Sequence, residues 1–325
     1  MHSHPLSSGS MRTPSALGLL AVAIVLAACG ATAPPAPTQG PPASGYSGWP
    51  IGPDPNASMV PLIVSSELVS GPNRFLFSLT DAKNALIAAP DLATTVRFYD
   101  LAADPATSVT ETDGVFIWTV PDEIGLYHAA VTFTRAGPWG VEVVAAKAGG
   151  PDLAARVVFD VRDTGTTPAL GSKAPSSDTL TAGTPEEIAA ISTDDDPDPD
   201  FYRVSVADAL AAGRPFVLVF ATPLFCSSRT CGPTLDNVKG IAAPYKDRID
   251  FIHVEPYKLE QVSGGLQLYV DASGGFQVVP AVAEWGLPTE PWVFVVAADG
   301  TLAAKFEGAV GADELREVLN ALVDG

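Results

Sequence analysis

Charged side chains are scarce in this sequence, and basic ones are scarcest. Of 325 residues, 17% are charged, and 37 acidic side chains against 18 Lys and Arg give a net charge of −19. A surface of this sign repels nucleic-acid phosphates and anionic lipid headgroups, so we expect no nucleic-acid partner. The 47% apolar content excludes a wholly disordered chain. The length is enough for two domains of ordinary size.

Long hydrophobic runs are also missing. The longest, SALGLLAVAIVLAA at residues 15–28, is shorter than the ~20 residues that a membrane-spanning helix needs. Arg12 precedes it, and a positive charge before a short apolar core is typical of a secretory signal peptide. The run leads into LAACG at residues 26–30, which resembles the lipobox of bacterial lipoproteins. The resemblance implies that residues 1–28 are a signal peptide and that Cys29 carries a lipid, which anchors an extracytoplasmic protein to a bacterial membrane.

Residues 29–56 are rich in Pro, Gly and Ala. This composition favours a semi-extended chain without a packed core, so we expect a tether between the membrane and the folded part. Disulfide bonds persist outside the cytoplasm, and this location therefore affects how the other two cysteines are interpreted.

Side chains that bind soft metals are few. The sequence has four His and three Met, and the candidates beyond the tether, Met59, His128 and His253, are far apart. His128 lies in an alternating stretch and His253 in an apolar run, and both settings are typical of packed or structural side chains. We therefore expect no metal and no cofactor.

Residues 57–163 alternate short apolar–polar runs with turn residues. Seven candidate strands rich in Val, Phe, Tyr and Thr, without a helical period, indicate an antiparallel β-sandwich. EIGLY at residues 123–127 resembles the tyrosine corner of immunoglobulin-like sandwiches, with Tyr127 opening a strand. GLYHAAVTFTRAGPWGVEV resembles the paired strands of FixH/YtkA-type extracytoplasmic domains. We expect this domain to act as a spacer or to bind a partner, without chemistry of its own.

Residues 164–200 are polar, and DDDPDPD at residues 194–200 places five carboxylates in seven residues. A calcium loop needs a glycine turn and a later bidentate Glu, whereas this run lacks the glycine and is stiffened by its prolines. We expect a solvated acidic linker between two domains.

Residues 201–325 favour an alternation of strands and helices. PFVLVFAT, just before the cysteines, is typical of a strand buried on both faces, and Pro233 suits the first turn of a helix. IDFIHVEPY predicts a second buried strand, and Asp299-Gly300 predicts a hairpin turn. GADELREVLNALV predicts a closing amphipathic helix.

This order of elements resembles the thioredoxin fold, and among exported proteins it is similar to the TlpA-like and Sco-type families. Cys231-Gly232-Pro233 matches the first three residues of the family's Cys-Gly-Pro-Cys motif. WGLPTEPWVFV at residues 285–295 is similar to the run that leads to the family's cis-proline. The resemblance implies a thioredoxin-like domain at residues 201–325, with Pro291 at the cis position facing the cysteines.

The sequence departs from the family at the second cysteine of the motif. Thr234 takes its place, and Cys226 stands five residues before Cys231 instead. A helix that starts after Cys231 leaves Cys226 in a loop, which can bend to bring the two Cα atoms within the ~4.4–6.8 Å that a disulfide needs. We therefore expect a Cys226–Cys231 disulfide.

Three hypotheses remain for this pair: a redox-active pair, a structural disulfide or half of a metal site. A helix N-terminus would lower the pKa of the Cys231 thiol, and Arg229 would add to this. These features favour a thiol–disulfide oxidoreductase in which Cys231 attacks, Cys226 resolves the mixed disulfide and Pro291 shapes the substrate groove. The family's buried acid is absent from FVLVF, so Glu255, after the second buried strand, is the candidate proton acceptor.

The partners expected from the first hypothesis are exported protein thiols or disulfides and a redox partner. The second hypothesis makes the domain a non-catalytic thioredoxin-fold binding module with a structural disulfide. The third makes it a copper-handling protein, which would require His253 to lie near the cysteines.

Overall fold

The structure is a computed structural model that describes residues 45–50, 52, 57–147 and 150–324. The predicted signal peptide at residues 1–28 and the predicted lipid on Cys29 lie outside the described residues. Within the described part of the chain, no helix is long and apolar enough to cross a membrane.

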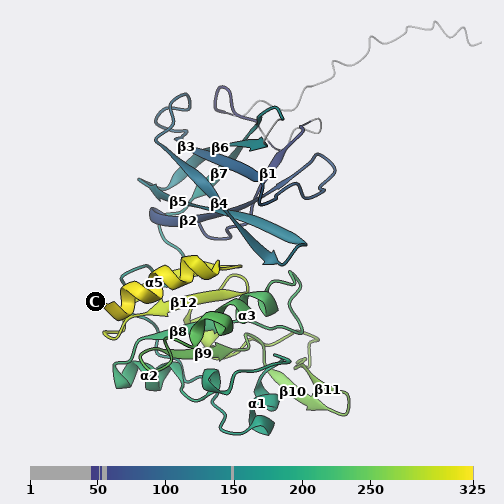
Figure 1. Ribbon diagram of the computed structural model, residues 1–325, viewed down its shortest axis with the longest axis vertical. Coiled ribbons are helices and arrows are strands. Elements are labelled where there is room, and N and C mark those ends of the chain that lie inside the picture. Colours follow the sequence, from purple (N-terminus) through teal and green to yellow (C-terminus); the bar gives the residue numbers. More distant parts are fainter. Residues whose placement is uncertain (1–44, 51, 53–56, 148–149, 325) are drawn as a thin grey trace, which may run out of the picture. The chain divides into compact units, whose positions relative to one another are not determined.

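Residues 60–161 form a seven-stranded antiparallel sheet (Figure 1). Its strands are β1 (Val60–Ile63), β2 (Gly71–Thr80), β3 (Leu92–Asp100), β4 (Thr110–Val120), β5 (Ile124–Phe133), β6 (Gly137–Lys147) and β7 (Leu153–Val161). Their order across the sheet is β1-β2-β5-β4-β3-β6-β7. The seven strands that the sequence predicts are therefore present.

The sheet is folded over and nearly closed on itself. The first half of β4, Thr110–Gly114, pairs with β3, whereas its second half, Val115–Val120, pairs with β5. At the two ends of the strand order, Val69 next to β2 forms a bridge with Arg162 next to β7. The two faces that turn inward can therefore share one core.

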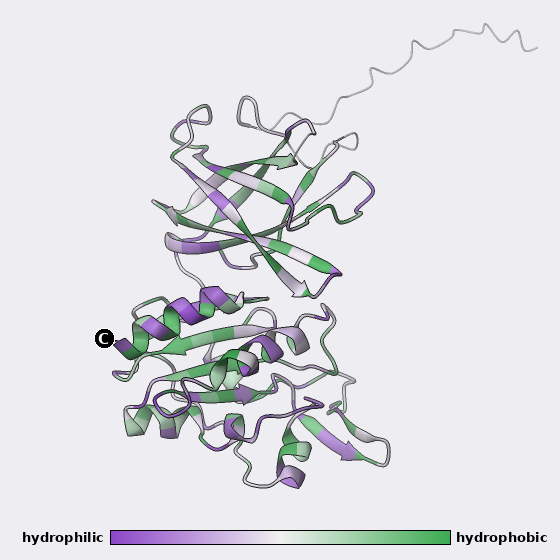
Figure 2. Ribbon diagram, in the orientation of Figure 1, coloured by the Kyte–Doolittle hydropathy of each residue, from purple (hydrophilic) through white to green (hydrophobic). Residues whose placement is uncertain are grey.

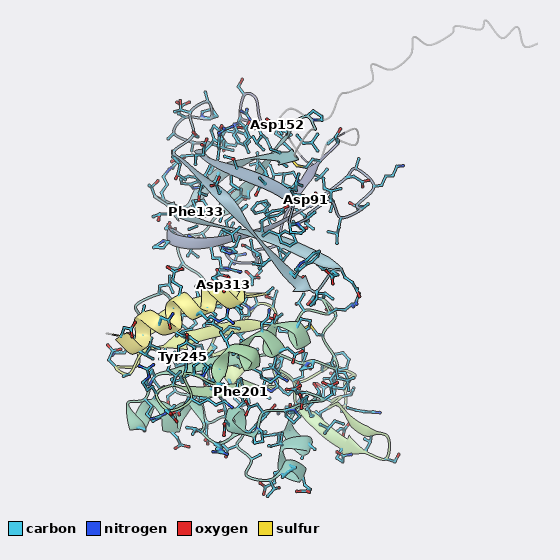
Figure 3. All side chains as sticks on the ribbon, in the orientation of Figure 1. Asp91, Phe133, Asp152, Phe201, Tyr245 and Asp313 are labelled. Atoms are coloured by element: carbon cyan, nitrogen blue, oxygen red, sulfur yellow. A yellow bond between two sulfur atoms is a disulfide. The ribbon has the colours of Figure 1, made fainter. Side chains whose placement is uncertain are left out.

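That core is aromatic. Phe75 and Phe98 lie edge-to-face with ring centroids 5.0 Å apart, and Phe133 meets Trp139 in the same way at 4.9 Å. All four side chains are fully buried, and Figure 3 labels Phe133 among them. Such pairs contribute about 0.5–1.5 kcal/mol each beyond the burial of their area. Alternation along the strands, seen in Figure 2, directs these rings inward.

Tyr127 differs from the expected tyrosine corner. It is the fourth residue of β5 rather than the first, and its hydroxyl lies 2.9 Å from the carbonyl oxygen of Ala89 and 3.0 Å from that of Leu92. In a tyrosine corner the hydroxyl bonds to backbone only a few residues upstream. Here it holds the connection between β2 and β3, so the expectation of a tyrosine corner is wrong.

A second, four-stranded sheet follows, with helices on both faces. Its elements are α1 (Pro185–Ile191), η1 (Pro199–Tyr202), α2 (Val206–Ala212), β8 (Phe216–Phe220), α3 (Cys231–Ala242), β9 (Asp250–Val254), α4 (Pro280–Glu284), β12 (Trp292–Val296), β13 (Leu302–Glu307) and α5 (Ala312–Asp324). The strand order is β13-β12-β8-β9, and only the β8–β9 pair is parallel. A separate hairpin, β10 (Leu259–Val262) and β11 (Gly265–Leu268), leaves the sheet after β9.

Alternate residues of each buried strand divide between the two faces of this sheet. Val217 and Val219 of β8 pack with α3 and α5, whereas Phe216, Leu218 and Phe220 pack with α2 and α4. All five residues of β8 are fully buried, as the continuous apolar run predicts. The amphipathic α5 buries Leu315 and Leu319, and its alternating colours are visible in Figure 2.

The acidic segment at residues 194–200 is not a solvated linker. The side chain of Asp194 is only 4% exposed and lies 2.7 Å from Nζ of Lys239 on α3. Lys246 is held in turn by Asp198 and Asp200. The expectation of a solvated loop is wrong because two lysines, more than forty positions downstream, pair with these carboxylates.

Candidate functional site

Cys226 and Cys231 form a disulfide, as predicted, at the carboxyl end of β8. Residues 221–230 form the loop between β8 and α3, and Cys231 is the first residue of α3. The two Cα atoms are 6.0 Å apart, inside the range that a disulfide needs. The loop therefore bends back far enough to bring the two cysteines together, as the sequence predicted.

The two sulfurs differ in accessibility. Cys231 is fully buried in the core between the sheet, α3 and α5, whereas Cys226 is only partly buried and packs at the edge of that core. Ser227, Ser228 and Arg229 around it are exposed. An incoming thiol would therefore reach the sulfur of Cys226 first.

Hydrogen-bond donors at the start of α3 converge on Cys226. The backbone N–H of Cys231 donates to Sγ of Cys226 across 3.3 Å, and the hydroxyl of Ser228 lies 3.2 Å from the same sulfur. Thr230, at the N-cap position, makes no side-chain cap and lies 2.8 Å from the Ser228 hydroxyl instead. The sulfur of Cys226 thus occupies the place of a helix cap, where negative charge is stabilised. Sequence reasoning missed Ser228, although a hydroxyl between two cysteines was visible in SSRT.

Arg229 does not lie against the sulfurs. It is the non-glycine residue with a φ of 63° in the loop, and its guanidinium donates to the carboxylate of Glu123, in the turn between β4 and β5, across 2.8 Å. Both side chains are more than half exposed. The expectation that Arg229 adds to the stabilisation of the thiolate is therefore wrong.

Thr234 stands where a Cys-Gly-Pro-Cys motif would have its second cysteine. Its side chain is buried, and its hydroxyl donates to the carbonyl of Gly308, which follows β13, across 3.4 Å. Position 234 therefore contributes to the packing of α3 against the end of β13. The Glu290–Pro291 peptide is cis, as predicted, and the Pro291 carbonyl accepts from the N–H of Gly308. The orientation of Pro291 toward the cysteines stays a prediction.

Glu255 lies directly after β9. It is 6% exposed, and its Oε1 accepts from the N–H of Thr193 across 2.7 Å and from the Thr193 hydroxyl. That hydroxyl oxygen also accepts from the N–H of Leu224, two residues before Cys226. The carboxylate is therefore connected to the loop through Thr193, a residue that sequence reasoning missed. This connection can position the loop, and a direct proton transfer between Glu255 and a cysteine stays a prediction.

His253 is buried in β9 and engaged at both ring nitrogens. Nε2 lies 3.0 Å from the carbonyl oxygen of Ala221 and Nδ1 lies 2.9 Å from the hydroxyl of Tyr202. A carbonyl can only accept, so Nε2 carries the proton and the Tyr202 hydroxyl donates to Nδ1. Burial lowers the pKa of His253, which favours this neutral form. Binding a metal through His253 would require breaking one of these bonds, and no cluster of three His, Cys, Asp or Glu side chains suited to a metal occurs among the described residues.

Comparison with known proteins assigns no family. No family model matches the chain, and no curated protein matches it. Among solved structures, MtrC from Shewanella baltica OS185 is similar at a TM-score of 0.23 and 15% sequence identity, over 36% of this chain. The matched part spans 24% of that chain, about a quarter of its length. A likeness this weak carries no argument about function.

Proposed function

We propose that the protein is a membrane-anchored, extracytoplasmic thiol–disulfide oxidoreductase that uses the Cys226–Cys231 pair. The observation that carries the proposal is the setting of Cys226. Its sulfur is partly exposed, accepts from the first N–H of the twelve-residue helix α3 and lies beside the Ser228 hydroxyl. Donors at a helix N-terminus lower the pKa of a thiol and increase its thiolate fraction at neutral pH.

The order of elements supports a thioredoxin-like domain as the setting. A buried strand, β8, leads into the cysteine loop and α3, and the parallel strand β9 follows. The antiparallel pair β12–β13 and the helix α5 complete the sheet and one of its helical faces. This order is what the proposal expects of the family.

The strand order of the first sheet supports the proposal of an immunoglobulin-like sandwich. Strand order β1-β2-β5-β4 corresponds to A-B-E-D, and β3-β6-β7 corresponds to C-F-G, the two sheets of the constant-type domain. β4, which pairs on both sides, joins the two sheets. We assign this domain to spacing or partner binding.

The oxidised protein would accept two electrons in two exchange steps. A partner thiolate attacks Sγ of Cys226, the S–S bond breaks, and its electron pair leaves on Sγ of Cys231 as a thiolate. A second partner thiolate then attacks the partner sulfur of the mixed disulfide, and Cys226 leaves as a thiolate. The partner dithiol has become a disulfide, and the two protein thiolates take up protons according to their pKa values.

The reverse direction starts from the same sulfur. The Cys226 thiolate attacks a partner disulfide and releases one partner thiolate. The Cys231 thiolate then attacks Sγ of Cys226, which breaks the mixed disulfide, restores the protein disulfide and releases the second partner thiolate. These roles are opposite to those expected from the sequence, because Cys231 is buried and the helix N–H points at Cys226. Pro291 keeps its proposed role in shaping the groove that receives the partner.

Two measurements on the purified full chain test the proposal. In a Cys29→Ser background, which removes the third cysteine of the chain, we expect the thiol left in the Cys231→Ser variant to react faster with an aromatic disulfide reagent than the thiol left in the Cys226→Ser variant. We also expect a reduction potential above about −300 mV, because structural disulfides lie below that value. A lower potential, together with a Cys226 thiol no faster than an unfolded cysteine, would make the disulfide structural and the domain a binding module.

A further inference from the structure

A pocket of about 410 Å³ lies at the carboxyl end of β9, where His253, Val254 and Glu255 contribute to its lining. Its walls come from the end of α1, the start of β10, the start of α4 and the extended segment at residues 178–180. Figure 1 shows α1 beside the β10–β11 hairpin. The lining is mainly apolar, with Leu180, Ile191 and Val279 among its side chains. A pocket of this size and polarity is typical of sites for small molecules or side chains.

Glu255 is one of the residues that line this pocket. Its side chain is more than nine-tenths buried, and both hydrogen bonds from Thr193 go to Oε1. Oε2 is buried and has no hydrogen-bond partner in the part of the chain that the structure describes. A buried carboxylate oxygen without a donor is costly, and a ligand that donates to it would remove that cost.

The charges of the lining favour a cation. Lys258 directs its ammonium to the amide oxygen of Gln277, 2.9 Å away, and both ring nitrogens of His253 are engaged. Asp178 adds an exposed second carboxylate to the lining. The net charge of −19 over the whole chain would attract a positively charged ligand further.

We propose that this pocket binds a primary alkylammonium group and that the carboxylate of Glu255 turns its buried Oε2 toward the pocket to accept from the ligand nitrogen, with the carbon chain lying along the apolar walls. An ammonium has three donors and no acceptor, which suits an oxygen that lacks a donor. A carbon chain of four or five atoms suits walls made of Leu, Ile and Val, in the manner of a lysine side chain. The binding does not depend on whether the disulfide exchanges with thiols.

The test is a titration of the oxidised full chain at neutral pH with n-pentylamine and with 1-pentanol. The two probes have equal chain length and differ in charge, so their comparison needs no variant. We expect the amine to bind at least about tenfold more tightly, because a hydrogen bond to a charged group is worth that factor. Methyl resonances of Ile191 and Val279 report whether the probe enters this pocket.

Two variants locate the effect. Glu255→Gln keeps an oxygen for Thr193 but presents an amide donor in place of Oε2, so the preference for the amine should disappear. Glu260→Gln removes an exposed carboxylate from β10, outside the lining, and should leave the preference unchanged. Far-UV circular dichroism and the melting temperature check that both variants fold.

A second pair of probes distinguishes the sources of the ammonium group. Binding of Nα-acetyl-lysine methylamide but not its norleucine analogue would assign the pocket to a lysine side chain of a partner polypeptide. Binding of n-pentylamine without the lysine derivative would assign it to a free aliphatic amine. Equal binding of amine and alcohol, an unchanged preference in Glu255→Gln, or resonance shifts away from the pocket would overturn the proposal. If the disulfide did not exchange with thiols, these binding results would still hold, because the titration does not involve the cysteines.

Discussion

Replacement of Glu67 by Gln should destabilise the protein strongly at neutral pH and weakly in acid. Glu67 lies in the connection between β1 and β2, and its carboxylate accepts from Thr166 and Thr167, after β7, and from Nζ of Lys305 on β13, 3.0 Å away. Only 2% of its side chain is exposed. One carboxylate therefore holds together three segments that are far apart in the sequence.

The magnitude follows from the pKa of Glu67. Burial raises this pKa, but the hydrogen bonds from Thr167, Lys305 and Thr166 and the charge of Lys305 outweigh burial and lower it from 4.5 to about 2. A difference of this size between folded and unfolded states corresponds to about 3 kcal/mol of stability. Because the folded pKa is the lower one, this contribution is complete above pH 4.5 and is lost as the pH falls toward 2. About 2 kcal/mol of it should be gone by pH 3.

The assay is urea unfolding of the full chain, followed by tryptophan fluorescence between pH 7 and pH 3. Glu67→Gln should lower the free energy of unfolding by about 3 kcal/mol at pH 7, and the difference from the wild type should shrink toward pH 3. Glu111→Gln is the matched control, because that carboxylate is 55% exposed in its pair with Arg97 and should contribute less than about 1 kcal/mol.

Gly165→Ala tests the same site without removing the charge. A Cβ at position 165 would overlap the carboxyl group of Glu67, so the variant should also be destabilised. A loss in Glu67→Gln no larger than in Glu111→Gln, or one of equal size at pH 7 and pH 3, would refute the assignment of this stability to the ionised carboxylate.

Three further predictions concern the cysteines and their loop. In a Cys29→Ser, Cys231→Ser background, which leaves Cys226 as the one cysteine, Ser228→Ala should raise the pKa of the Cys226 thiol, measured by the ultraviolet absorbance of the thiolate, while Ser228→Thr keeps the hydroxyl and should retain the value of the background. Arg229→Ala should change the free energy of unfolding by less than about 1 kcal/mol, because its pair with Glu123 is exposed, and should leave the reaction rate of the Cys226 thiol unchanged. Cys29→Ser should move the full chain, expressed in a bacterium, from the membrane fraction to the soluble fraction, and retention in the membrane would contradict lipid anchoring.

The elements that local patterns determine could be predicted from the sequence. Alternation and continuous apolar runs indicated the strands, the spacing of the cysteines indicated their disulfide, and Pro233 marked the first turn of α3. Long-range pairing could not be predicted in this way. Nothing local to Asp194 indicates that Lys239 will neutralise it, and the partners of Glu67 come from two distant segments. The prediction of a solvated run at residues 194–200 was wrong because lysines elsewhere in the chain pair with its carboxylates.

The roles of the two sulfurs also depend on a contact that local sequence patterns do not predict. With two residues between the cysteines, as in the family's motif, the first cysteine lies at the helix N-terminus and receives its donors. Here four residues intervene, the positive φ of Arg229 turns the loop back, and the first N–H of α3 meets the sulfur of Cys226 although Cys231 begins the helix. The accessible sulfur and the stabilised sulfur are therefore the same atom, which the order of residues alone does not reveal. An accessible sulfur with helix donors and a buried partner is the arrangement that the proposed thiol–disulfide exchange would require.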